Sequence, residues 1–156
     1  MATRTDKPVV DFTQRRFIWG TDKTEPRLLH LALRVRSLER SIGFYVEGLG
    51  MKLLDRISLP PGKLTAAFVG YDDYDRGGLI ELCEQWEDSG PYTHGTGFGH
   101  ISIGVGNVDA AVGKLEAMGA EVTVPPRDYD GVGPRLCYLK DPDGYLIELI
   151  QTAQAG

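Results

Sequence analysis

One short sequence occurs twice in this chain and strongly constrains how the chain can fold. The tetrapeptide Leu-Ile-Glu-Leu stands at residues 79–82 and again at residues 146–149. A histidine in an alternating apolar segment precedes each copy, as His30 and as His100, so the two halves are offset by about 70 residues. A repeat of this kind indicates a duplicated structural unit. We therefore expect two modules with the same fold.

The first half has the pattern of a strand, a helix and three further strands. Residues 29–35 alternate between apolar and mixed side chains, which is the period of a strand. Residues 39–47 have a helical period and follow Ser37, a residue type that caps helices. Turns rich in Pro, Gly and Asp separate the three extended runs that follow, at residues 51–58, 64–71 and 78–84.

The second half repeats this order. Residues 100–105 alternate, Asn107 is a capping residue type, and residues 108–118 have a helical period. Further extended runs cover residues 121–124, 136–139 and 145–151, with the tight-turn sequence Asp-Pro-Asp-Gly at 141–144. The sequence therefore predicts an α+β fold of two tandem βαβββ modules.

The modules leave connecting and terminal segments. We place module 1 at residues 27–84 and module 2 at residues 100–151, joined by a Gly-rich linker at 85–99 that contains His94, expected to be exposed. Residues 152–156 form a short tail. Residues 1–26 are polar without a clear period, which indicates an N-terminal arm that packs on its own domain or on a neighbouring subunit.

Composition excludes several classes of function. The 156 residues carry a net charge of −5, which argues against a nucleic-acid partner because phosphate binding draws on clustered Lys and Arg. No apolar run reaches membrane-spanning length, and the N-terminus lacks the apolar core of a secretory signal, so we expect a cytoplasmic protein. Cys83 and Cys137 form no CxxC motif and are expected to be free thiols.

Each module places one histidine near the start of its first strand and one glutamate in its last strand. Strand alternation puts the flanking apolar residues on the opposite face, against the helices. These flanking residues are Leu29, Leu31, Ile80, Leu82, Ile101, Ile147 and Leu149. The polar residues His30, Glu81, His100 and Glu148 then occupy the other face of their sheets.

A cation would satisfy this set, because an unpaired carboxylate in apolar surroundings is costly. A single His or Glu in a strand is more often a core or surface residue. Recurrence of both residue types at corresponding places in the two copies favours ligands. Two nitrogen and two oxygen donors suit a borderline divalent metal such as Zn²⁺, Ni²⁺ or Co²⁺. We therefore predict a metal site formed by His30, Glu81, His100 and Glu148.

Several motifs between residues 28 and 150 form a specific set. They are LLHLALRV at 28–35, RSIGFY at 40–45, LGM at 49–51, FVGY at 68–71, LIEL at 79–82, GFGHI at 97–101 and DPDGY at 141–145. With these motifs the chain resembles the glyoxalase I (lactoylglutathione lyase) family of the vicinal-oxygen-chelate superfamily. The resemblance implies the fold of paired βαβββ modules and the same four metal ligands, with Ni(II) or Zn(II) as the metal and Co(II) as a further candidate.

The resemblance also implies a reaction. In the family, methylglyoxal and glutathione combine spontaneously to a hemithioacetal, which is isomerised through an enediolate to S-lactoylglutathione. It implies that Glu148 is the main base, which removes the proton from carbon 1, and that Glu81 has the opposing role on the other side of the substrate. Many family members are homodimers in which each site takes ligands from one module of each chain, and a site within one chain is the alternative.

The resemblance gives three candidate substrate contacts. Arg34 shares the strand face of His30 and corresponds to an Arg that holds the glutamyl carboxylate of glutathione, the alternative being a surface ion pair. Gln85 stands where the family usually has Asn. Residues 128–135 lack the usual Lys-Gly step that meets the glycine carboxylate, which leaves Arg135 as the nearest cation.

These departures keep other functions open. A metal-dependent epimerase of an acyl-CoA thioester would use the same proton abstraction next to a carbonyl, as would another enzyme of the superfamily with a different substrate. An Fe(II) dioxygenase of this superfamily uses two His and one Glu, and Glu81 argues against it. A non-catalytic binding module would be expected to lose the ligands, and all four are present.

Overall fold

The computed structural model describes residues 25–87 and 90–152 and divides into two compact units, Met1–Tyr92 and Thr93–Gly156. The predicted N-terminal arm lies outside the described residues up to residue 24, and so does the tail from residue 153 onward.

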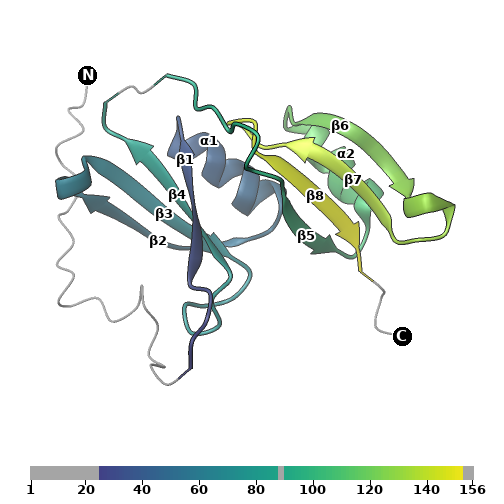
Figure 1. The fold of residues 1–156 in the computed structure, drawn as a ribbon, viewed down its shortest axis with the longest axis horizontal. Coiled ribbons are helices and arrows are strands. Elements are labelled where there is room, and N and C mark those ends of the chain that lie inside the picture. The colour runs from purple at the N-terminus through teal and green to yellow at the C-terminus, as the bar shows by residue number, and fades with distance from the viewer. Residues whose placement is uncertain (1–24, 88–89, 153–156) are drawn as a thin grey trace. The chain divides into compact units, whose positions relative to one another are not determined.

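The first unit has the predicted βαβββ order (Figure 1). Its elements are β1 (His30–Val35), α1 (Leu38–Ile42), a π-helical segment (Gly43–Gly48), β2 (Lys52–Leu59), a 3-10 turn (Pro60–Gly62), β3 (Leu64–Gly70) and β4 (Leu79–Gln85). The strand order in the sheet is β1-β4-β3-β2, with β1 parallel to β4 and the other pairs antiparallel.

The second unit repeats this topology. Its elements are β5 (Ile101–Val105), α2 (Val108–Ala117), β6 (Glu121–Asp128), a 3-10 turn (Tyr129–Gly131), β7 (Arg135–Lys140) and β8 (Leu146–Gln151). The strand order is β5-β8-β7-β6, again with only the first pair parallel. The predicted duplication and the α+β class are therefore confirmed.

Two elements differ from their predicted form. The helix expected over 39–47 is α-helical only to Ile42 and then widens into the π-helical segment, in which the consecutive residues Phe44 and Tyr45 are both buried. The strand expected over 121–124 runs on as β6 through two prolines to Asp128. Proline lacks the N–H that a ladder needs, and β6 tolerates it because it is the edge strand and its register shifts there.

Each helix covers one face of its own sheet, and the apolar residues that flank the glutamates lie in these cores. Ile80 and Leu82 are buried in the first unit, and Ile147 and Leu149 in the second. The prediction was wrong for Leu31, which is 44% exposed. The reason is that β1 is an edge strand, whereas α1 packs on β3 and β4.

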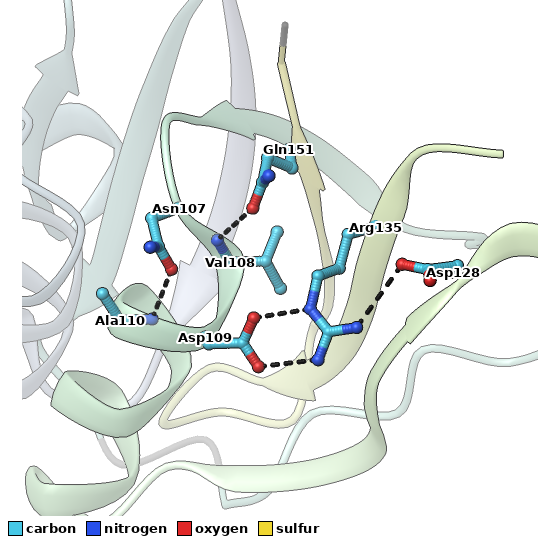
Figure 2. A network of polar contacts seen from close by, with 7 residues as sticks. All are labelled: Asn107, Val108, Asp109, Ala110, Asp128, Arg135 and Gln151. Carbon is cyan, nitrogen blue, oxygen red and sulfur yellow. Dashed lines mark hydrogen bonds and ion pairs between the residues drawn. The ribbon is translucent and has the colours of Figure 1, made fainter. Parts of the chain in front are cut away.

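A matching pair of caps ties each helix to the strand that carries the glutamate. The Leu38 N–H, at the start of α1, donates to the Glu84 carboxylate at 3.4 Å, three residues after Glu81. The Val108 N–H, at the start of α2, donates to Gln151 Oε1 at 3.2 Å, three residues after Glu148 (Figure 2). Helix N-termini carry unsatisfied N–H groups, so these bonds fix the helix against the last strand.

Gly77 allows the chain before β1 to lie against the start of β4. A Cβ at Gly77 would stand 2.0 Å from the Leu28 carbonyl oxygen, whereas a Cβ at Gly78 would meet open space, and both residues have a positive φ. The Gly78 N–H donates to the same oxygen at 3.0 Å, and Leu28 lies two residues before His30. Gly77 therefore sets how closely the strand that carries His30 approaches β4.

We expect Gly77→Ala to lower the free energy of unfolding by at least about 1 kcal/mol more than Gly78→Ala does. Both substitutions carry the cost of a positive φ, so their difference isolates the clash with the Leu28 carbonyl. Urea unfolding of both variants measures it. Equal losses would contradict the close approach.

None of the helices within residues 25–87 and 90–152 combines the length and the apolar character needed to span a bilayer.

Candidate metal centre

The first His–Glu pair lies on the face of the first sheet opposite α1. Glu81 is paired across the ladder with Ala32 of β1, and His30 lies two residues earlier on β1 and so shares its face. The His30 Nε2 atom is 3.2 Å from Glu81 Oε2, and the two side chains are 24% and 15% exposed. Phe68, the cross-strand partner of Glu81 on β3, meets the His30 ring edge-on with centroids 5.5 Å apart.

The second pair repeats this arrangement in the second sheet. Glu148 is paired with Ser102 of β5, and His100 stands two residues before Ser102. The His100 Nε2 atom is 3.2 Å from Glu148 Oε2. Tyr138, the cross-strand partner of Glu148 on β7, meets the His100 ring edge-on at 5.5 Å. The two modules therefore present the same imidazole, carboxylate and aromatic ring in the same geometry.

The two glutamates differ in their hydrogen bonds. The Tyr138 hydroxyl donates to Glu148 Oε1, and the Ser102 side chain also bonds Glu148. Burial raises the pKa of Glu148, but these bonds and the neighbouring His100 outweigh it and hold the pKa below its ordinary value. The corresponding residues of the first module, Ala32 and Phe68, have no side-chain group that can donate. Glu148 is therefore held as a carboxylate near neutral pH.

The donor set of each pair fits a divalent cation. An imidazole nitrogen and a carboxylate oxygen face each other at 3.2 Å in both modules, and both atom types are ligands of borderline divalent metals. Within residues 25–87 and 90–152, no group of three or more His, Cys, Asp or Glu side chains is arranged to hold a metal ion. The pairing of His30 with Glu81 and of His100 with Glu148 thus lies within single units, and the four-ligand set stays a prediction.

Arg34, Cys83 and Gln85 share the face of the first pair. Arg34 is paired with Cys83 across β1 and β4, and Gln85 lies two residues further along β4. Burial and then the Glu81 charge raise the pKa of the Cys83 thiol to about 12, so it is protonated at neutral pH. Cys83 packs with Phe68 in an apolar cluster. This cluster gives the face an apolar wall beside the polar pair.

Arg135 lies elsewhere. It is three residues before Tyr138 on β7, so strand alternation directs it to the opposite face from Glu148. Its guanidinium donates to both carboxylate oxygens of Asp109 on α2, with Nη2 at 2.7 Å from Oδ1. It also donates to the Asp128 carboxylate (Figure 2). The hydrogen bond from Arg135 lowers the pKa of Asp109. Arg135 therefore links α2 to the β6–β7 hairpin through its ion pairs.

His94 was expected to be exposed, and this was wrong. Its ring is half-buried and stacks on Tyr145 with centroids 4.1 Å apart, while Phe98 meets Tyr145 edge-on at 5.4 Å. These three aromatic rings attach the end of the predicted linker to the turn that begins at Asp141, whose carboxylate accepts from the N–H groups of residues 143 and 145 at 2.9 Å.

Comparison with known proteins decides the family. The Glyoxalase/Bleomycin resistance protein/Dioxygenase superfamily matches residues 27–149. A probable lactoylglutathione lyase from Vibrio parahaemolyticus is 44% identical over 130 residues, which are 83% of this chain and 94% of that protein. The chain belongs to the glyoxalase I family. The family named from the sequence motifs is thereby confirmed.

Solved structures of glyoxalase I enzymes have the same fold. Glyoxalase I from Zea mays is 36% identical with a TM-score of 0.77, and the match covers 82% of this chain and 45% of that chain. The trypanothione-dependent glyoxalase I of Leishmania major is 35% identical with a TM-score of 0.71, and the match covers 81% of this chain and 87% of that chain.

Sequence reasoning for this glyoxalase I homologue missed Tyr138 and Ser102. Ser102 could have been found from alternation, because it lies two residues after His100 on the same face. Tyr138 needed the register between β7 and β8, which depends on the length of the turn between them.

Proposed function

We propose that this chain is an enzyme that isomerises the hemithioacetal of methylglyoxal and glutathione to S-lactoylglutathione and so detoxifies 2-oxoaldehydes. The observation that carries the proposal is the recurrence of one geometry, a His Nε2 atom 3.2 Å from a Glu Oε2 atom beside an aromatic ring, in both modules. Lactoylglutathione lyases with 42–44% identity over most of this chain support the choice of reaction.

The proposed ligands are His30, Glu81, His100 and Glu148, with Ni(II) or Zn(II) as the cation. When bound, the cation supplies electrostatic stabilisation of negative charge that develops on the substrate oxygens. Neutral imidazoles and ionised carboxylates are the protonation states that metal binding needs, and the hydrogen bonds of Glu148 favour its ionised form.

The two glutamates move the proton. The Glu148 carboxylate takes the proton from carbon 1 of the hemithioacetal, and the electron pair of that bond forms the carbon–carbon double bond of an enediolate. The proton is then delivered to carbon 2. The hydroxyl proton on the oxygen of carbon 1 passes to the oxygen of carbon 2, so the first oxygen becomes the carbonyl of the thioester and the second the hydroxyl of the lactoyl group. Glu81 is assigned the opposing role on the other side of the substrate. A positioned carboxylate of this kind contributes about 10²–10⁴-fold to a proton transfer.

A homodimer with shared sites would bring the two kinds of pair together. In this proposal the first module of one chain and the second module of the other hold one cation. The alternative is a site formed by the two modules of one chain.

The assay of the purified chain tests the function. Protein freed of metal and then loaded separately with Ni²⁺ or Zn²⁺ is given methylglyoxal and glutathione, and thioester formation is followed in the ultraviolet. We expect turnover with at least one metal and its loss on chelation. Parallel assays replace glutathione with trypanothione, or the hemithioacetal with an acyl-CoA thioester epimer, and a preference for either would overturn the proposed substrate.

We expect Arg34→Ala to raise KM for the hemithioacetal, with a smaller change in kcat. The guanidinium shares a strand face with the first His–Glu pair, and a charge-assisted bond to a carboxylate is worth about 1.5–3 kcal/mol, or roughly 10–100-fold in KM. Arg135→Ala is the matched control. Because Arg135 already binds Asp109 and Asp128, its loss should leave KM within about twofold. The reverse result would place the glutathione contact at Arg135.

A further inference from the structure

The two modules offer an internal comparison of their glutamates. Glu81 and Glu148 occupy the same place in duplicated sheets, each with a histidine at 3.2 Å and an aromatic ring across the ladder. What differs is the set of donors around each carboxylate. Any difference in behaviour between the two glutamates can therefore be traced to those few neighbours.

The surroundings of Glu148 supply two hydroxyl donors. The Tyr138 hydroxyl donates to Oε1, which leaves Oε2 as the oxygen that faces His100. Ser102, directly across β5, bonds the same carboxylate. Both oxygens of Glu148 are thus assigned to separate partners, and rotation of the carboxylate would break at least one contact. The side chain is only 10% exposed, so water competes poorly for these bonds.

The surroundings of Glu81 supply much weaker donors. Phe68 stands in the place of Tyr138, and Ala32 in the place of Ser102, so neither hydroxyl has a counterpart. Within residues 25–87 and 90–152, the Cys83 thiol donates to the backbone carbonyl oxygen of Glu81 at 4.0 Å, and a thiol is a weak donor. The Glu81 carboxylate is therefore held mainly by His30.

We propose that Tyr138 is a positioning residue that, together with Ser102, fixes the orientation of the Glu148 carboxylate, so that Glu148 is the rigid and Glu81 the loosely held acidic ligand of the site. This rests on the proposed function, in which both glutamates bind the cation. Residues that hydrogen-bond a ligating carboxylate preorganise it, and their loss costs about 10–100-fold in metal affinity or activity. Tyr138 does not touch the reacting atoms in this role.

Tyr138→Phe tests the proposal, because it removes one hydroxyl and gives module 2 the ring that module 1 carries. Metal-free protein is titrated with Zn²⁺ against a chromophoric chelator, without substrate. We expect the Kd to rise about 10–100-fold, with kcat lowered and KM little changed. A Kd within about twofold of the parent chain would overturn the proposal.

A double-substitution cycle shows whether the effect acts through Glu148. In a Glu148→Ala background, Tyr138→Phe should change the Kd by less than about twofold, since there is no carboxylate left to orient. An undiminished effect in that background would assign Tyr138 a general structural role and overturn the proposal. Phe68→Tyr is the reciprocal variant and should tighten Zn²⁺ binding by giving Glu81 a hydroxyl.

Two further variants guard the interpretation. Tyr71→Phe removes a hydroxyl that donates to the Leu49 carbonyl oxygen at 2.8 Å and not to either glutamate of the pairs. This variant should leave the Kd for Zn²⁺ unchanged. Should Tyr138→Phe fail to fold by circular dichroism, Ser102→Ala carries the same test at an exposed strand position, and an unchanged Kd there overturns the proposal. A parent chain that binds Zn²⁺ but does not turn over the hemithioacetal refutes only the proposed substrate. A chain that binds no divalent metal refutes both.

Discussion

Glu148→Gln should lower kcat for the hemithioacetal by at least about a hundredfold, because an amide cannot accept the proton from carbon 1. The substitution keeps the shape of the side chain and its bond from Tyr138, since the amide oxygen is still an acceptor. The fold should therefore survive, with circular dichroism and the unfolding midpoint close to those of the parent chain. Steady-state kinetics with saturating metal separates this chemical loss from a loss of metal.

Glu81→Gln is the matched control for that experiment. It makes the same chemical change at the corresponding place of the other module, where Phe68 stands in place of Tyr138 and offers no hydroxyl donor. If Glu148 is the main base, Glu81→Gln should cost less in kcat. The reverse order would move the main base to Glu81, and equal, small losses would remove both glutamates from the proton transfer.

The duplicated fold could be predicted from the sequence because its signals are local. The repeated Leu-Ile-Glu-Leu and the alternation around His30 and His100 fix which residues share a face, since strand alternation is strict. Each histidine and glutamate indeed lie 3.2 Å apart within their module. The motif set also led to the correct family, and three of its motifs, LLHLALRV, LIEL and GFGHI, contain members of the two pairs.

The sequence could not show the surroundings of a side chain where these depend on register or on an edge. Leu31 follows the apolar period but lies on an edge strand, so the period alone could not show its exposure. Arg135 was chosen as the nearest cation along the chain, whereas its strand face directs it to Asp109, 26 residues away. Tyr138 reaches Glu148 only through the β7–β8 ladder, which no local pattern reveals.

The widening of the first helix is a different case. A helical period extends over 39–47, but the π-helical segment begins at Gly43, a residue that weakens a regular helix. Phe44 and Tyr45 follow it and are both buried, with their rings edge-on at 5.1 Å. Tertiary packing in the core therefore outweighs the local helical period over 39–47.

Mixing two inactive variants should restore activity if the sites are shared between chains. His30→Ala disables the first module and His100→Ala the second, and each protein alone should lose nearly all metal-dependent turnover because one nitrogen ligand is gone. A mixed dimer would combine an intact first module from one chain with an intact second module from the other. Random pairing of equal amounts makes half of the dimers mixed, with one intact site each, so about a quarter of the parent activity should return.

The outcome separates the two proposed arrangements because a site within one chain cannot be repaired by a second chain. The matched control mixes His30→Ala with Glu81→Ala, which both disable the first module. Shared sites then gain nothing, since every first module in the mixture is defective. Recovery in the first mixture and none in the control would support shared sites. No recovery in either mixture, after chain exchange has been verified with differently tagged proteins, would place the four ligands within one chain. Recovery in both would show that the histidine and the glutamate of one module do not bind the same cation.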